Sequence, residues 1–265
     1  MGIFRRIEFF EERMSKVIDI KNIKISCSQC SLQQLCLPRG LSHDEFESLT
    51  AIVKRERPYA KGEPVFQIGQ PFKSLFAVRT GSVKVFLQSD DGDEQIVGFH
   101  MPGELLGFDG MGHDKHCCAA VALESSSICE LPYSRLHDLA REMPSLSDHF
   151  MTLMSNEIAD EHAMMLMLAK KSAEARMATF LLSLSLRFKK RGFSPYQFNL
   201  TMSRHDIANY LGLAVETVSR IMTHMQDAGL IEVDRRFVSI TNMPELRALA
   251  GLPQDREALM DCRTE

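Results

Sequence analysis

Three cysteines, Cys27, Cys30 and Cys36, fall within ten residues near the start of the chain. The segment around them, residues 26–40, is rich in Ser, Gln, Pro and Gly and carries only one charge, at Arg39. Thiolates are the ligands that soft metals and iron–sulfur clusters select, and such a loop can fold around a metal centre. Three ligands are one short of a tetrahedral set, so the fourth must come from elsewhere in the chain.

The other cysteines do not suggest a disulfide framework, because the chain is long and its seven cysteines are an odd number. The N-terminal segment is charged and lacks the apolar core of a signal peptide, and no apolar run is long enough to span a membrane. We therefore expect a reducing cytoplasm. There the spacing leaves zinc and an iron–sulfur cluster equally open, with redox-active thiols as a third alternative. His113 and His116 lack ligand spacing, and we expect both to be solvated.

The charge of the chain is distributed unevenly. The net charge is −4, yet residues 170–241 contain eleven Lys and Arg against six Asp and Glu, which leaves −9 on the remainder. A basic module on an acidic body is typical of a DNA-binding domain attached to a sensor.

Residues 55–132 contain short apolar segments separated by turn residues such as Asp91-Gly92 and Pro102-Gly103. These turns recur every eight to twelve residues, which predicts a small antiparallel sandwich or barrel.

A long helix is predicted to begin at Pro144. Its candidate seam steps by three and four residues through Met151, Met154, Ile158, Glu161, Met165 and Leu168. This spacing favours a helix that pairs with a second copy, the alternative being an amphipathic helix lying on its own domain. In a two-fold seam Glu161 would face its own copy, and the repulsion would suit a switch. A second helix is expected from Lys170 to Phe188.

The C-terminal part predicts a winged helix–turn–helix. Ser203 can cap a helix over residues 204–211, Gly212 can make the tight turn, and a second helix spans residues 215–227. Two strand-like segments after Gly229 would form the wing. A generic helical hairpin is the alternative.

The second of these helices carries Val215, Glu216, Ser219 and Arg220 near its N-terminus, where a recognition helix meets base edges. Arg can bind guanine through two hydrogen bonds, Glu can accept from cytosine, and Val can touch a thymine methyl group. The alternative is a surface ion pair between Glu216 and Arg220, worth only a few tenths of a kcal/mol.

This order of elements resembles the CRP/FNR superfamily of bacterial transcription regulators over residues 27–250. The resemblance rests on Gly81-Ser82-Val83, Pro102-Gly103-Glu104 and the segment Glu216-Thr-Val-Ser-Arg220, and the Cys-x2-Cys-x5-Cys loop is similar to that of the oxygen-sensing FNR branch. It implies an α+β fold: an antiparallel β-roll of the cupin-like, cyclic-nucleotide-binding type, a long dimerisation helix and a C-terminal winged helix–turn–helix. The expected division is 1–40 for the extension and Cys loop, 41–143 for the sensor roll, 144–169 for the dimerisation helix, 170–250 for the DNA-binding domain and 251–265 for the tail.

The resemblance also implies one [4Fe–4S] cluster per subunit on Cys27, Cys30, Cys36 and Cys129. In the cyclic-AMP-binding branch an Arg-Ser pair holds the phosphate, and Cys117 and Cys118 stand at the matching positions. We therefore expect no cyclic nucleotide, because a buried phosphate would lack its cation. Cys117 and Cys118 are expected to line the pocket as small apolar residues, and Cys262 is expected to have no role in ligation.

These features predict a cytoplasmic, oxygen-responsive activator or repressor of anaerobic metabolism. It would bind a TTGAT-type inverted repeat as a homodimer and act with RNA polymerase, and loss of the cluster would release the monomer. Two alternatives remain: an enzyme or redox protein that uses the Cys loop, although no catalytic constellation is apparent, and a DNA-binding protein with structural zinc.

Overall fold

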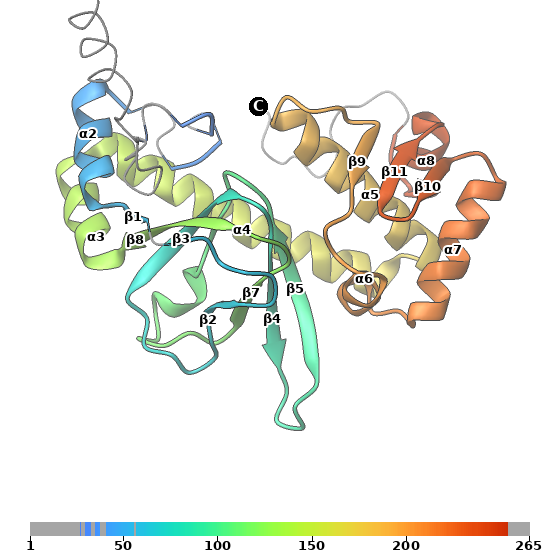
Figure 1. Ribbon diagram of the computed structural model, residues 1–265, viewed down its shortest axis with the longest axis horizontal. Helices are drawn as coiled ribbons and strands as arrows, with labels where there is room; N and C mark the ends of the chain where they lie inside the picture. Colours follow the sequence, from blue (N-terminus) through green and yellow to red (C-terminus); the bar gives the residue numbers. More distant parts are fainter. Residues whose placement is uncertain (1–26, 28–29, 33–34, 38–40, 56, 254–265) are drawn as a thin grey trace, which may run out of the picture.

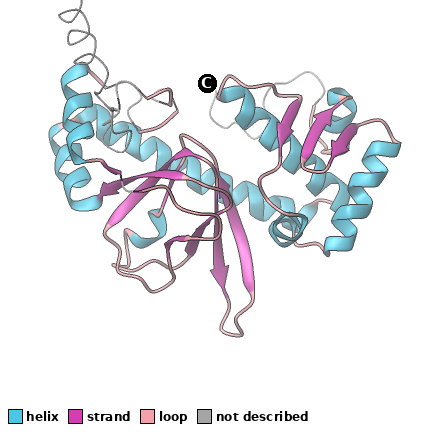
Figure 2. Cartoon of the chain, viewed as in Figure 1, coloured by secondary structure: helices cyan, strands magenta, loops and turns pink. Residues whose placement is uncertain are grey.

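The computed structural model describes residues 27, 30–32, 35–37, 41–55 and 57–253, and it contains two lobes joined by the long helix α4 (Pro144–Lys170) (Figures 1 and 2). The N-terminal extension and Cys262 lie outside these residues. No helix in the described part of the chain is long and apolar enough to cross a membrane.

The N-terminal lobe is a β-roll of two four-stranded antiparallel sheets. One sheet has the order β1-β8-β3-β6 and the other the order β2-β7-β4-β5. Apolar side chains between the sheets, among them Phe66, Val78, Val83 and Ile128, form the core of the roll. The strands are β1 (Lys54–Arg55), β2 (Pro64–Phe66), β3 (Ser74–Thr80), β4 (Val83–Gln88), β5 (Glu94–His100), β6 (Leu105–Leu106), β7 (Ala119–Ala122) and β8 (Ser127–Pro132).

The turn at Gly81 explains one of the sequence motifs. Gly81 has φ +82°, and a Cβ at this position would lie 2.2 Å from Ser126 Oγ. That hydroxyl accepts a hydrogen bond from the Ser82 backbone N–H at 3.2 Å. Only Gly tolerates both the left-handed backbone and this close approach, so the Gly81-Ser82 turn holds β4 against the loop before β8.

Helices cover one end of the roll. They are α2 (His43–Ile52), the short 3₁₀ helix η4 (Phe108–Gly110) and α3 (Tyr133–Glu142). Leu49 of α2, Leu136 of α3 and Leu146 of α4 are buried together there with the roll residue Leu75. This apolar cluster is the platform on which the Cys loop lies.

Helix α4 begins with Pro144 in its first turn, as expected, and ends at Lys170. The next helix, α5 (Ala173–Lys190), differs from the prediction of residues 170–188 at both ends. The Ser172 side chain caps α5 by accepting a hydrogen bond from the Ala175 N–H at 3.2 Å. The helical conformation is therefore interrupted at Lys171, between α4 and α5.

The C-terminal lobe is a winged helix–turn–helix, as the sequence predicts. Ser203 and Asp206 form a capping box at the start of α6 (Arg204–Leu211), and Gly212 ends it in the left-handed conformation with φ +61°. Helix α7 (Val215–Asp227) follows. The wing has one strand more than expected, because β9 (Gln197–Asn199) pairs with β11 (Phe237–Ile240), which pairs with β10 (Ile231–Asp234); α8 (Met243–Leu249) closes the lobe.

Candidate functional site

The Cys loop is attached to the helical end of the roll. The Cys27 backbone N–H donates to Thr50 Oγ1 of α2 at 3.3 Å, and Leu37 is buried in the apolar cluster beneath the loop. Cys36 and Cys129 both pack against the same cluster, Cys129 from strand β8. Residues separated by more than ninety positions are therefore brought to one end of the roll.

Arg55 joins two of these thiols, and nothing in the sequence pattern singled it out. Strand β1 pairs with β8 so that Arg55 lies opposite Cys129. Its Nε donates to Cys129 Sγ and its Nη2 to Cys27 Sγ, each at 3.5 Å. One guanidinium thus bridges a thiol of the Cys loop and a thiol of the sheet.

The four thiols also influence one another electrostatically. Burial raises the pKa of Cys36 to about 12, and the neighbouring Cys129, Cys27 and Cys30 add to this rise. Burial likewise raises the pKa of Cys129, while the hydrogen bond and positive charge of Arg55 oppose it. Burial therefore favours the neutral thiols of Cys36 and Cys129, and a metal centre that neutralises thiolates would reverse this preference.

Four thiols beside an apolar cluster and a guanidinium match the donor chemistry of an iron–sulfur or zinc centre. As the side chains stand, no group of three or more His, Cys, Asp or Glu among the described residues is arranged to hold a metal ion. The donor set fits such a centre in its chemistry and in its place at the helical end of the roll.

The roll contains a second polar cluster around Asp109. Its Oδ2 accepts the backbone N–H groups of Cys117 and Cys118 at 2.7 and 3.2 Å, and its Oδ1 lies 3.3 Å from Nδ1 of His116. The expectation that His116 is solvated is wrong: it is 3 % exposed and stacks on Phe66 with ring centroids 3.9 Å apart. The buried imidazole of His116 thus has an aromatic stacking partner in Phe66 and a polar partner in Asp109.

Cys118 lies in the core of the roll, as expected for a small apolar residue, whereas Cys117 is exposed, contrary to expectation. The two residues lie in the bend just before β7, where both backbone N–H groups donate to Asp109 and only the Cys118 side chain enters the core. His113 is exposed, as expected.

The predicted seam lies on a face of α4 that its own chain leaves largely open. Met151, Ile158 and Met165 are 64, 52 and 68 % exposed, Glu161 is exposed, and Met154 and Leu168 are half-buried. Burial raises the pKa of the nearby Glu157 to about 7, and the carboxylates of Asp160 and Glu161 add to the rise. An apolar stripe of this kind marks an interaction surface, and here it carries a concentration of negative charge.

The predicted base-reading residues form the exposed N-terminal face of α7. Glu216, Ser219 and Arg220 are exposed and Val215 is half-buried. Arg220 donates to Thr217 Oγ1 at 3.3 Å, and no ion pair joins it to Glu216 in the described structure. Val218 and Ile221, on the opposite face, are buried in the domain core. The helix therefore presents its polar N-terminal face outward while its apolar face holds it in place.

Models of two domain families match the chain. The cyclic nucleotide-binding domain matches residues 56–143, and the Crp-like helix-turn-helix domain matches residues 175–249. The transcriptional activator protein anr of Pseudomonas aeruginosa is 50 % identical over 239 residues, which cover 90 % of this chain and 98 % of the relative. The chain belongs to the FNR branch of the CRP/FNR family.

Other relatives agree with this assignment. The fumarate and nitrate reduction regulatory protein of Escherichia coli is 45 % identical over 241 residues, covering 91 % of this chain and 96 % of the relative. Among solved structures, FixK2 of Bradyrhizobium japonicum has a TM-score of 0.69 at 29 % identity, covering 75 % of this chain and 97 % of that one. The family confirms the predicted α+β fold and a DNA-binding transcription regulator, and it excludes the enzyme alternative.

The position of Arg55 leads to a prediction for the metal-free protein. Arg55→Gln should slow alkylation of Cys129 roughly tenfold at about pH 8, because the thiolate loses the charge that opposes the effect of burial. Peptide mass mapping after iodoacetamide treatment measures the rate at each cysteine. Arg57→Gln is the matched control, since Arg57 pairs with Glu63 at an exposed position. Equal rates in both variants would show that Arg55 does not influence the thiol.

Proposed function

We propose that the chain is an oxygen-responsive regulator of anaerobic metabolism, in which Cys27, Cys30, Cys36 and Cys129 hold one [4Fe–4S] cluster per subunit. The observation that carries this proposal is that Arg55 bridges the thiols of Cys27 and Cys129, while Cys129, Cys27 and Cys30 act electrostatically on Cys36 at the same end of the roll. When bound, such a cluster supplies iron that oxygen can oxidise. The names of the relatives, which refer to fumarate and nitrate reduction, support a role in anaerobic metabolism.

The protein's own residues have clear tasks in this site. The Cys27–Thr50 hydrogen bond and the buried Leu37 fix the loop on the platform of α2. Arg55 offsets part of the negative charge that deprotonated thiols would bring to a poorly solvated place. The apolar cluster around Cys36 and Cys129 limits access of water.

The first prediction concerns the ligands. Cys27→Ser, Cys30→Ser, Cys36→Ser and Cys129→Ser should each lose most iron from anaerobically purified protein, because one open coordination site admits water and oxygen. Cys117→Ser and Cys118→Ser should retain it. Iron and sulfide analysis together with the visible spectrum measures this. Colourless protein with one zinc per chain would show that the site holds structural zinc in place of the cluster. Full iron retention by Cys129→Ser would show that Cys129 is not the fourth ligand.

We propose that α7 reads a TTGAT-type half-site through Val215, Glu216, Ser219 and Arg220. Support comes from the outward-facing N-terminal half of α7 and from the basic charge of residues 170–241. Among the described residues the Arg220 side chain donates an exposed hydrogen bond to the hydroxyl of Thr217, so it can turn to a guanine without breaking a buried contact.

Arg220→Ala should cost about 1–3 kcal/mol of discrimination between the half-site and a sequence changed at its guanine. Lys189→Ala, at the basic end of α5, should instead weaken binding to all sequences alike, because phosphate contacts carry no sequence information. Titrations with labelled half-site and scrambled duplexes at fixed salt distinguish a loss of discrimination from a uniform loss of affinity. An equal loss on both duplexes for Arg220→Ala would contradict direct readout.

We further propose that the active form is a homodimer paired through Met151, Met154, Ile158, Glu161, Met165 and Leu168, bound to an inverted repeat. The exposed stripe on α4 supports this, since a second copy would cover it. The carboxylates of Glu161 and its neighbours Glu157 and Asp160 oppose pairing, so dimerisation needs a further contribution, which we assign to the loaded Cys loop.

Glu161→Ala should allow the cluster-free protein to dimerise in air, with an association constant raised roughly 5- to 150-fold, the range of ordinary coupling energies. Glu142→Ala, an exposed change on α3, is the control. Because the pKa of Glu157 is raised to about 7, lower pH should also favour the unmutated dimer as this group takes up a proton. Sedimentation measures both effects. If Glu161→Ala stays as monomeric as the control, Glu161 has no part in the switch.

Three further assignments belong to the proposal. The roll binds no cyclic nucleotide, because the carboxylate of Asp109 already accepts the amide groups of Cys117 and Cys118, where a phosphate would need donors.

RNA polymerase is the partner through which a bound activator acts. The location is the cytoplasm, where DNA is available and thiols stay reduced.

A further inference from the structure

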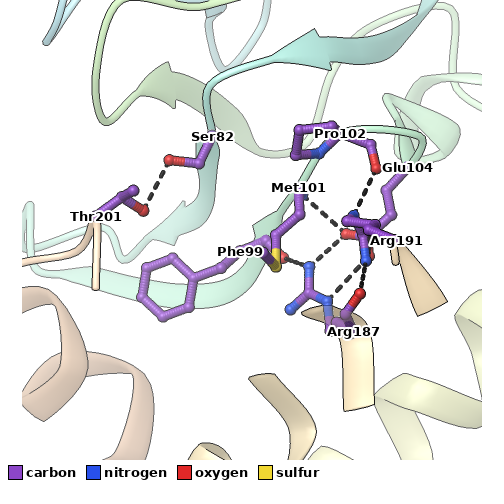
Figure 3. Close-up of polar contacts among 8 residues, drawn as sticks. All are labelled: Ser82, Phe99, Met101, Pro102, Glu104, Arg187, Arg191 and Thr201. Atoms are coloured by element: carbon purple, nitrogen blue, oxygen red, sulfur yellow. Dashed lines mark hydrogen bonds and ion pairs between the residues drawn. The ribbon is translucent and has the colours of Figure 1, made fainter. Parts of the chain in front are cut away.

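A half-buried carboxylate of the roll, Glu104, contacts the DNA-binding lobe. Glu104 lies just before β6, and its Oε1 accepts from Arg187 Nε of α5 at 2.9 Å and from Nη2 of Arg191, the C-cap residue of α5, at 2.6 Å (Figure 3). Arg187 also donates to the carbonyl of Phe99, and Arg191 Nε donates to the carbonyl of Pro102 at 2.7 Å. We call Glu104, Arg187 and Arg191 the domain clamp.

The clamp favours one geometry because its charges are partly shielded from water, with the Glu104 side chain 29 % exposed. The side chain of Arg191 is 5 % exposed and that of Arg187 is 24 % exposed. Burial alone would raise the pKa of Glu104, but the two guanidinium groups outweigh it and hold the pKa at about 2. A rotation of α5 away from the roll would leave a buried charge without its partner, which is strongly unfavourable.

A second set of polar contacts holds the other side of the same interface. Asn209 of α6 accepts from the Ile96 N–H of β5 at 2.5 Å and donates to the Glu94 carbonyl at 2.6 Å. Lys84 of β4 pairs with Asp206 at 3.0 Å. Two helices of the DNA-binding lobe are thus attached to the roll at separate points, which restricts rotation as well as separation.

These contacts leave the base-reading surface open. They involve α5 and α6, whereas Glu216, Ser219 and Arg220 of α7 are exposed. In Figure 1 helix α7 lies at the outer edge of its lobe, on the side away from the roll. An inhibitory contact would cover the recognition helix, and this one instead holds it facing outward.

We propose that Glu104 is a positioning residue for DNA recognition: through Arg187 and Arg191 it fixes the orientation of the recognition helix relative to the dimerisation helix. This inference rests on the proposed homodimer and inverted repeat. Two recognition helices must meet half-sites about one helical turn apart, and simultaneous binding gains affinity only if their separation is already correct.

The clamp also adjoins the Cys loop. Gly103 has φ +92°, and a Cβ there would lie 2.8 Å from the Cβ of Leu35, the residue before Cys36. Leu35 therefore packs directly against the backbone of the segment that carries Glu104. The thiol site and the clamp contact neighbouring residues of one loop.

The test compares wild-type protein with Glu104→Gln and Asn209→Ala, all purified anaerobically. Affinities are measured for a single half-site, the inverted repeat, and a repeat with one extra base pair between half-sites. Wild type should prefer the repeat over the half-site by roughly 10²–10⁴-fold, the usual gain from bivalent binding. In both variants the preference for the repeat should fall at least about tenfold, and the extra base pair should reduce the affinity less than it does in wild type. Their affinity for the half-site should be unchanged.

Glu63→Gln is the control, because it breaks an ion pair with Arg57 that lies away from the interface. Asn209→Ala keeps the test decisive if Glu104→Gln does not fold. An unchanged preference in Asn209→Ala and any folded Glu104→Gln would overturn the positioning role, and tighter binding to the repeat would show that the contact restrains the protein. A wild-type protein without preference for the repeat would instead contradict the proposed operator.

Discussion

The structure depends on a constraint at helix α4, which has apolar residues on more than one face. Leu146 is buried against α2, α3 and the roll, and Met167 is buried in the core that includes the DNA-binding lobe. These contacts use one face of the helix along its length. Met151, Ile158 and Met165 on another face remain exposed. This is the face that the second copy would cover in the proposed homodimer.

The same helix sets the two lobes side by side, and charges at their border decide how they meet. Apolar residues of the roll, such as Phe99 and Ile96, share one core with Phe180 and Leu211 of the other lobe. Apolar packing alone tolerates sliding, whereas the ion pairs of the half-buried Glu104 with Arg187 and the buried Arg191 oppose it. Leu35 of the Cys loop packs against Gly103, next to Glu104, so the Cys loop and the DNA-binding lobe contact neighbouring residues of one segment.

Local rules explain why so much of the chain could be predicted. The capping box at Ser203, the left-handed Gly212 and the periodicity of residues 215–227 act within a few residues of one another, and α6 and α7 form where they predict. The same holds for Pro144 at the start of α4 and for the hairpin turn at Gly92. Where a local cue was overlooked, as with the Ser172 cap, the boundary of α5 was misplaced.

The sequence by itself determined the family, the two lobes, the cysteine loop and the recognition helix, because each is encoded by spacing along the chain. Only the tertiary structure decided which distant groups meet. Arg55 reaches Cys129 through strand pairing, His116 is buried by stacking on Phe66, and Glu104 finds Arg187 eighty-three residues away. No periodicity marks these pairs. They form because a buried charge or polar ring must find a partner, and the packing of the lobes decides which one is near.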